Sequence, residues 1–188
     1  TLLRFRGTLD LEETRRRFDL PERYAVATLH RPSNVDVDVA AANVVDGLRR
    51  VADQVRIVLP LHPRGRENLE RHGLMSIPGI DVVDPIGYVD FMALLSGAAL
   101  VMTDSGGIQE ETTVLGVPCL TLRENTERPI TVSMGTNTIV GNDPVRIETS
   151  AIAFLDAPPK GRIPPLWDGR AGERIASILV DDDLAGDS

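Results

Sequence analysis

The chain has 188 residues, of which 42% are hydrophobic and 26% are charged, and its net charge at pH 7 is −8. This composition is typical of a globular chain with one core, and an acidic balance without a basic stripe argues against a nucleic-acid partner. No apolar run reaches the roughly 18 residues that cross a membrane, so we expect no membrane partner and a cytoplasmic location.

Short apolar runs alternate with segments of helical period along the chain. The predicted strands are Tyr24 to Thr28, Ile57 to Leu61, Ile80 to Val83, Ala99 to Thr103, Cys119 to Leu122 and Thr138 to Val140. The predicted helices are Asp38 to Ala52, a segment around Phe91 to Leu95, Gly107 to Leu115 and Arg170 to Val180. Non-alternating strands separated by helices predict an α/β fold with a doubly wound, parallel, six-stranded sheet.

Three local features refine this prediction. Pro60 has no N–H for a sheet hydrogen bond, so we expect its strand to end there. Cys119 is the only cysteine, which excludes an intrachain disulfide, and its apolar neighbours indicate a buried strand residue rather than a nucleophile. One domain is expected over residues 1–180, followed by an acidic disordered tail over 181–188.

Polar residues follow five of the predicted strands. They are His30 to Asn34, His62 to Arg64, Gly87 and Tyr88, Asp104 to Gly107, and Arg123 to Arg128. The carboxyl ends of parallel strands meet at one edge of the sheet, where open α/β folds bind their ligands. An edge with two histidines, several arginines and a Gly-Gly helix start favours a phosphorylated ligand.

The segment Ser105-Gly106-Gly107 lies between a buried strand and a helix. Small residues let a phosphate approach the backbone, and the first-turn amides have no acceptor within the helix. Glu110 and Glu111 would repel a bare phosphate, so the ligand should carry hydroxyl groups as well. Other interpretations stay open here: the Ser-Gly-Gly segment as a simple helix cap, His30 and His62 as structural residues, and a surface ion pair of Glu127 with Arg128.

Several motifs together resemble the non-hydrolysing UDP-N-acetylglucosamine 2-epimerases. They are T-L-H-R-P-S-N-V-D from Thr28, P-L-H-P-R from Pro60, D-P-I-G-Y-V-D-F from Asp84, T-D-S-G-G-I-Q-E-E from Thr103 and L-R-E-N-T-E-R-P from Leu122. The resemblance covers roughly Leu11 to Val180. A Gly pair at a helix start would be weak alone, whereas these motifs in order are specific.

The resemblance implies a fold, a ligand and partners. Family members resemble GT-B glycosyltransferases with two Rossmann-like domains, and this chain matches only the second, which holds the nucleotide and ends in a crossover helix. An N-terminal domain and a homodimer of the full-length form are therefore expected partners, with UDP and UDP-N-acetylglucosamine as ligands.

Individual roles follow from the same resemblance. The residues expected to bind UDP are Phe91 at the uracil ring, Ser105, Gly106 and Gly107 at the diphosphate, Glu111 at the ribose, and Arg123 and Arg128 as charge stabilisers. His30 matches the family's histidine near the phosphates and is the expected catalytic residue.

The family reaction eliminates UDP and adds it back to the sugar, which requires no redox cofactor, and we expect no metal. The carboxylates acting at carbon 2 belong to the other domain, so we expect this chain to bind UDP without epimerising. Arg31 and His62 match an allosteric site for a second UDP-N-acetylglucosamine in some members. Pro32 and Ser33, where many members have Arg-Glu, put that regulation in doubt.

Two further functions remain open. A GT-B glycosyltransferase donor domain would share the fold and the nucleotide edge. A non-catalytic nucleotide-sugar sensor would share the binding site.

Overall fold

The computed structural model describes residues 2–63 and 65–185, apart from the side chains of 181–185. Six parallel strands form one sheet in the order β3-β2-β1-β4-β5-β6. They are β1 (Tyr24–Thr28), β2 (Arg56–Pro60), β3 (Ile80–Val83), β4 (Leu100–Thr103), β5 (Cys119–Thr121) and β6 (Asn137–Ile139). The predicted fold class is confirmed, and each strand boundary agrees with its prediction to within one residue.

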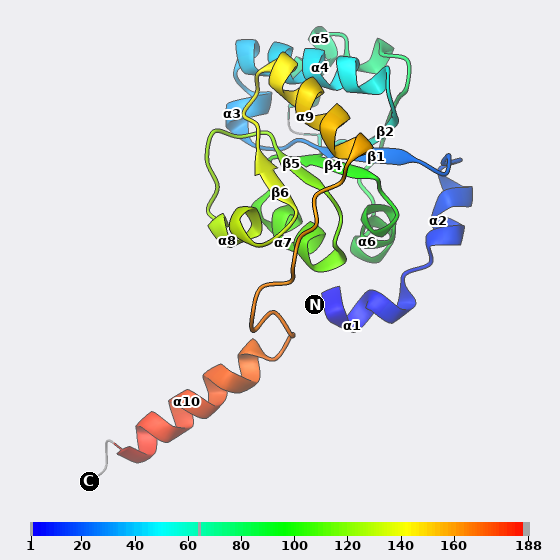
Figure 1. The fold of residues 1–188 in the computed structure, drawn as a ribbon. Coiled ribbons are helices and arrows are strands. Elements are labelled where there is room, and N and C mark those ends of the chain that lie inside the picture. The colour runs from blue at the N-terminus through cyan, green and yellow to red at the C-terminus, as the bar shows by residue number, and fades with distance from the viewer. Residues whose placement is uncertain (1, 64, 186–188) are drawn as a thin grey trace.

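Helices cover both faces of the sheet (Figure 1). One face carries α3 (Pro32–Val35), α4 (Asp38–Ala52), α5 (Arg66–Arg71) and α9 (Pro144–Asp156). The other carries α6 (Tyr88–Ser96), α7 (Gly106–Leu115) and α8 (Pro129–Ser133), with α1 (Leu2–Phe5) and α2 (Leu11–Arg17) beside it. Short 3₁₀ turns lie at Arg6–Thr8 and Leu74–Ser76.

The central strand β1 shows why apolar and polar residues do not alternate along the strands. Ala25 and Ala27 belong to the core cluster of α4 and α9, while Tyr24 and Val26 belong to the cluster of α6. All four side chains are fully buried. Because each face of the sheet has its own core, consecutive strand residues are apolar.

The end of β2 follows from its proline. Pro60 pairs with Val83 of β3 as the last residue of the strand, as predicted. The next residue, Leu61, supplies an amide that donates to the Val83 carbonyl at 3.0 Å. The chain then turns toward His62 at the carboxyl edge of the sheet.

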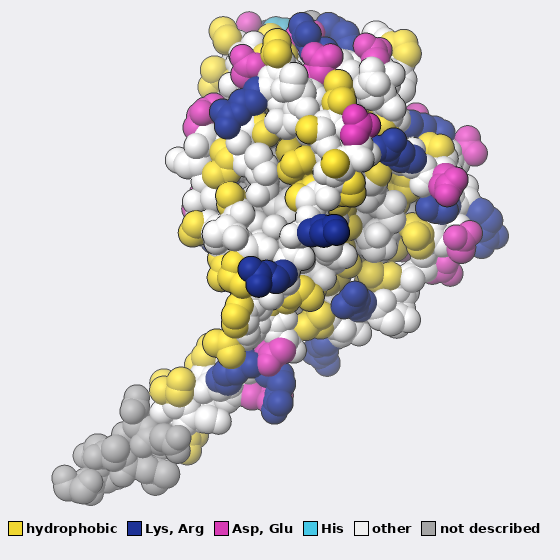
Figure 2. Space-filling model, in the orientation of Figure 1, with side chains coloured by type: hydrophobic (Ala, Val, Ile, Leu, Met, Phe, Trp, Pro, Cys, Tyr) yellow, Lys and Arg dark blue, Asp and Glu magenta, His cyan; other side chains and the backbone are white. Residues whose placement is uncertain are grey.

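The last helix, α10 (Ala171–Ala185), projects away from the sheet (Figure 1). Four of its apolar side chains are 57–60% exposed, namely Ile175, Ile178, Leu179 and Val180, and Figure 2 shows the projecting segment with apolar and charged side chains together. The helix continues through residue 185, into the predicted tail of 181–188, and residues 186–188 lie outside the described part of the chain. No described helix is long and apolar enough to cross a membrane.

Candidate functional site

The order of the strands determines where a ligand can bind. β1 and β4 are neighbours, and from β1 the chain proceeds to β2 on one side, while β4 leads to β5 on the other. Thr28 and Thr103 are paired at the ends of these strands, with 2.7 Å between their hydroxyl oxygens. Such a reversal of strand order opens a crevice at the carboxyl edge, so the residues after β1 and β4 face each other.

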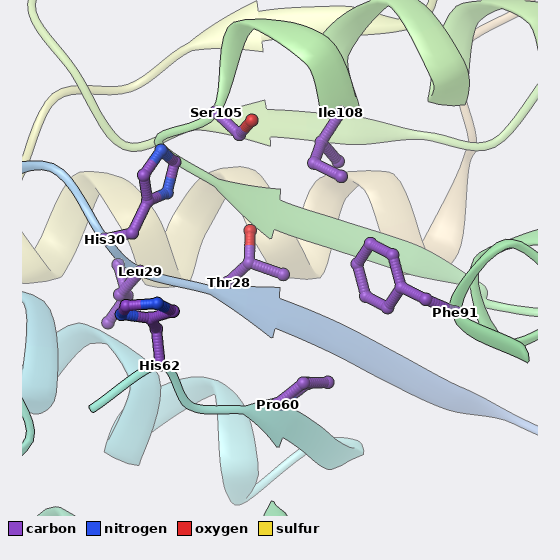
Figure 3. Close-up of a pocket in the computed structure, with 8 residues that line it drawn as sticks. All are labelled: Thr28, Leu29, His30, Pro60, His62, Phe91, Ser105 and Ile108. Atoms are coloured by element: carbon purple, nitrogen blue, oxygen red, sulfur yellow. The ribbon is translucent and has the colours of Figure 1, made fainter. Parts of the chain in front are cut away.

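A cavity of about 420 Å³ lies at this edge. Its lining consists of Thr28, Leu29, His30, Pro60, His62, Phe91, Ser105 and Ile108. Figure 3 shows the His30 ring between the end of β1 and Ser105, with Phe91 on the far side of the cavity. Four predicted site residues, His30, His62, Phe91 and Ser105, therefore meet around one cavity.

The start of α7 offers backbone donors to this cavity. Ser105 has the extended backbone of an N-cap residue, but its hydroxyl makes no cap hydrogen bond. The first bond of the helix runs from Gln109 N–H to the Ser105 carbonyl at 3.3 Å, so the amides of Gly106, Gly107 and Ile108 have no acceptor within the helix. Free amides at the positive end of a helix dipole suit a phosphate. The interpretation of Ser105 as a simple cap is not supported.

His30 lies against a buried carboxylate that sequence reasoning left without a role. The Nδ1 atom of His30 is 2.8 Å from Oδ1 of Asp104, whose side chain is fully buried. Asp104 precedes Ser105 directly, so the residue that contacts the histidine also leads into α7. His30 Nε2 has no partner among the described residues, and the histidine side chain is 46% exposed.

The arginine after β5 is bound by a carboxylate. Arg123 donates from Nη1 to Glu127 Oε2 at 2.7 Å and from Nη2 to Glu127 Oε1 at 2.8 Å. Arg31 adds a weaker ion pair to the same carboxylate at 3.8 Å. The hydrogen bond from Arg123 lowers the pKa of Glu127 to about 2. Glu127 therefore stays ionised and screens the charge of Arg123.

Arg128 forms an ion pair with a different residue from the expected one. Its Nε atom lies 2.6 Å from Glu110 Oε1, while its Nη1 atom donates to the backbone carbonyl of Glu127. The interpretation of Glu127 and Arg128 as a surface ion pair is therefore wrong. The Glu127 side chain pairs with Arg123, and the Arg128 side chain pairs with Glu110. Neither Arg123 nor Arg128 lines the cavity that holds His30.

Glu111 lies in a second cavity. Tyr88 donates a hydrogen bond to Glu111 Oε1 at 3.0 Å, and both residues line a space of about 390 Å³. The other lining residues are Leu2, Leu3, Glu110, Val114, Leu166, Trp167, Gly169 and Ala171. Burial raises the pKa of Glu111. The structure thus brings Ser105 and His30 together but places Glu111 in the second turn of α7, six residues after Ser105.

Gln109, the glutamine of the T-D-S-G-G-I-Q-E-E motif, has a structural role beside the site that the sequence did not predict. Its buried Oε1 accepts hydrogen bonds from Thr126 at 2.5 Å and from Asn137 at 3.3 Å. The Thr126 hydroxyl accepts in turn from the amide of Arg128 at 2.9 Å. Gln109 therefore ties the loop after β5 to α7 and β6.

The donor set of the edge suits an anion with an attached ring. Backbone amides, a histidine and an aromatic face converge on the first cavity, and carboxylates lie in the second. Among the side chains of residues 2–63 and 65–180, no group of three or more His, Cys, Asp or Glu could hold a metal ion.

Comparison with known proteins gives consistent matches. A family model described as UDP-N-acetylglucosamine 2-epimerase matches residues 3–180. The chain is 37% identical over 167 residues to the UDP-N-acetylglucosamine 2-epimerase of Methanocaldococcus jannaschii, a match covering 86% of this chain and 45% of that protein. It is 39% identical over 158 residues to the UDP-2,3-diacetamido-2,3-dideoxy-D-glucuronate 2-epimerase of Pseudomonas aeruginosa, covering 84% and 44%.

A solved structure agrees with these matches. The M. jannaschii UDP-GlcNAc 2-epimerase, crystallised in complex with UDP-GlcNAc and UDP, superposes with a TM-score of 0.79 at 36% identity. The superposition covers 90% of this chain and 48% of that one. The chain therefore spans less than half the length of the relatives it matches.

Proposed function

Because the chain belongs to the UDP-N-acetylglucosamine 2-epimerase family, we propose that it is the UDP-binding half of an enzyme that inverts carbon 2 of a UDP-sugar. The observation that carries this proposal is the convergence of His30, Ser105 and Phe91 on one cavity at the carboxyl edge. Such a site provides amides for a diphosphate and an aromatic face for a base.

The proposed reaction removes the proton on carbon 2 and breaks the bond between carbon 1 and the diphosphate oxygen. UDP then adds back to carbon 1 of the glycal on the face that it left, and a proton reaches carbon 2 from the opposite face, which inverts that carbon. The helix start at Gly106 and Gly107 would stabilise charge on the departing diphosphate. His30, whose Nε2 atom is available, would exchange a proton with that leaving group.

The relatives from M. jannaschii and P. aeruginosa are named for different UDP-sugars, and UDP is what the two names share. The residues of this chain described above suit the nucleotide. We propose UDP-N-acetylglucosamine as the substrate because the family model and the M. jannaschii relative carry its name.

We further propose that the missing half of the active site belongs to an N-terminal domain. The chain covers 45% of the M. jannaschii protein, and the groups acting at carbon 2 would come from the other part. The 188-residue chain should then bind UDP and release no epimerised product. A homodimer would be a property of the longer protein.

Titration calorimetry of the chain with UDP tests the nucleotide site. Gly106→Ala should weaken binding at least about tenfold, because a methyl group would occupy the space where phosphate approaches. That methyl group would lie 3.7 Å from Glu127 Oε2 and 3.9 Å from Arg128 Cγ, so the fold should tolerate it. Gly172→Ala is the matched control at the start of α10, where nothing lies within 4 Å.

Two outcomes would contradict the nucleotide site. One is the absence of heat at millimolar UDP. The other is an affinity that Gly106→Ala and Ser105→Ala both leave unchanged.

The reaction itself is tested in the longer protein. With UDP-N-acetylglucosamine in deuterated water, an epimerase incorporates solvent deuterium at carbon 2. Transfer of the sugar to an acceptor would favour a glycosyltransferase, and binding without exchange would favour a sensor. The rate of deuterium incorporation, compared between UDP-N-acetylglucosamine and UDP-2,3-diacetamido-2,3-dideoxy-D-glucuronate, identifies the preferred sugar.

A further inference from the structure

We propose that Asp104 is a positioning residue that holds His30 in the Nδ1–H tautomer, with Nε2 free to exchange a proton with bound ligand. The effect on catalysis rests on the proposed function, whereas the effect on the histidine does not. Asp104 joins the two sides of the cavity, because it contacts His30 after β1 and is followed by Ser105 at the start of α7.

The two carboxylate oxygens of Asp104 share the His30 amide and differ in their other partners. Oδ2 accepts from the Arg31 amide at 3.0 Å and from Asn34 Nδ2 at 3.3 Å. Oδ1 lies 2.8 Å from His30 Nδ1, and the His30 amide is 3.2 Å from both oxygens. The contacts of Oδ2 anchor the loop, and Oδ1 is left to orient the ring.

Burial makes this contact effective. The Asp104 side chain is fully buried and surrounded by donors, which offset the solvation that the carboxylate loses. A carboxylate accepts but does not donate, so its position 2.8 Å from Nδ1 favours a neutral His30 with its proton on that atom. The remaining lone pair is then on Nε2, the atom without a partner among the described residues.

This arrangement has a chemical consequence for the proposed reaction. With a second proton, His30 would donate from Nε2 to the diphosphate oxygen as its bond to carbon 1 breaks, and the ring would return to its neutral Nδ1–H form. On re-addition the proton would return to Nε2. Asp104 would stabilise the imidazolium throughout without becoming protonated itself.

The test is the tautomer of His30 in the 188-residue chain, measured from ¹⁵N shifts of labelled imidazole above the titration range. His30→Gln assigns the signal among the three histidines. Wild type should show Nδ1–H. Asp104→Asn should show Nε2–H, because the amides of His30 and Arg31 require the asparagine oxygen and leave its NH₂ facing Nδ1.

A second histidine–aspartate pair provides the control. His72 Nε2 lies 2.9 Å from Asp38 Oδ1 at the surface, where the Asp38 side chain is 68% exposed. Asp38→Asn should leave the His30 tautomer unchanged. Far-UV circular dichroism checks that Asp104→Asn folds. If that variant does not fold, the tautomer of His30 in the wild-type chain still tests the proposal.

An Nε2–H tautomer in wild type would overturn the proposal, as would an Nδ1–H tautomer in folded Asp104→Asn. In the longer protein, Asp104→Asn should lower kcat by about a hundredfold or more with little change in KM, as expected for loss of a positioned proton donor. Absence of epimerase activity in wild type, with the predicted tautomers, would contradict the proposed function and leave the role of Asp104 standing.

Discussion

At the scale of single residues, Glu127 is notable because two arginines of the carboxyl edge contact one carboxylate. Its two hydrogen bonds to Arg123 involve both oxygens, and Arg31 lies at 3.8 Å. Arg128 is likewise paired with Glu110. A diphosphate that uses either arginine must therefore compete with a carboxylate already in place.

The pKa of Glu127 gives a pH prediction. Because Arg123 lowers it from 4.5 to about 2, the contact contributes to stability above pH 4.5 and is lost as the pH falls toward 2. In Arg123→Gln the titration midpoint of the Glu127 carboxyl carbon, followed by NMR, should move up toward 4.5. Arg49→Gln, on the exposed surface of α4, should leave it unchanged. An unaltered midpoint in Arg123→Gln would contradict the pairing.

Gln109 gives a prediction about stability. Gln109→Leu removes the acceptor of Thr126 and Asn137 while keeping the side-chain size. The Thr126 hydroxyl then loses its acceptor and Asn137 Nδ2 keeps only Thr131, which should lower the free energy of unfolding by about 1–3 kcal/mol, measured by urea denaturation. Gln54→Leu, at an exposed position after α4, is the matched control and should change it little. Equal effects of the two substitutions would refute the structural role of Gln109.

The residue scale is also where sequence reasoning reached its limit. The positions of His30 and Ser105 after two strands were enough to predict that they meet at one edge. Nothing in the local pattern indicates that Asp104 points at His30 or that Arg123 pairs with Glu127. The first contact depends on side-chain directions across neighbouring strands, and the second depends on the conformation of the loop after β5. One signal for Asp104 was available: it directly follows β4, and β4 is the neighbour of β1, the strand that precedes His30.

At the scale of elements, the sequence predicted all six strands because each is a short buried run with polar residues at its end. Helix α9 was not predicted, although Asp143 and Pro144 mark its start: Asp143 accepts a hydrogen bond from the Arg146 amide at 2.8 Å, and Pro144 is the first helical residue. Helices as short as α3 and α8 have too few residues to show a period.

The packing of α4 against α9 depends on Gly47. A methyl group there would lie 2.8 Å from Ile147 Cδ1 and 3.2 Å from its Cβ and Cγ2. Gly47→Ala should therefore lower the free energy of unfolding by about 1–3 kcal/mol, although alanine favours a helix. Thermal or urea unfolding measures this, with Gly172→Ala as the control.

A double-mutant cycle separates overpacking from other causes. Ile147→Val removes the Cδ1 atom that is closest to the added methyl. The cost of Gly47→Ala should be smaller in the Ile147→Val background, giving a favourable coupling between the two substitutions. Additive effects would show that the strain arises elsewhere.

At the scale of the whole molecule, α10 stands apart from the sheet that carries the site. Isolated helices of roughly 12–15 residues are marginal in water, and α10 has 15 residues, with Ile175, Ile178, Leu179 and Val180 exposed. Its length and period predicted the helix from sequence, but no pattern within the chain could predict what it packs against.

Hydrogen exchange tests this isolation. The amides of 171–180 should exchange rapidly in the 188-residue chain, while those of β1 and β4 should be protected up to the global free energy of unfolding. Leu48→Ala, in the fully buried face of α4, should cost about 2–5 kcal/mol, whereas Ile178→Ser should stay within about 0.5 kcal/mol. Protection of α10 equal to that of α4 would contradict this description.

The single cysteine offers a kinetic reporter of the sheet beside the site. Cys119 is fully buried in β5, between β4 and β6, and burial raises the pKa of its thiol to about 12. Alkylation requires a thiolate in contact with reagent, so the labelling rate measures how often this part of the sheet opens. β5 leads directly into the loop of Arg123 and Glu127. A nucleotide that stabilises this loop would therefore lower the rate at which Cys119 is alkylated.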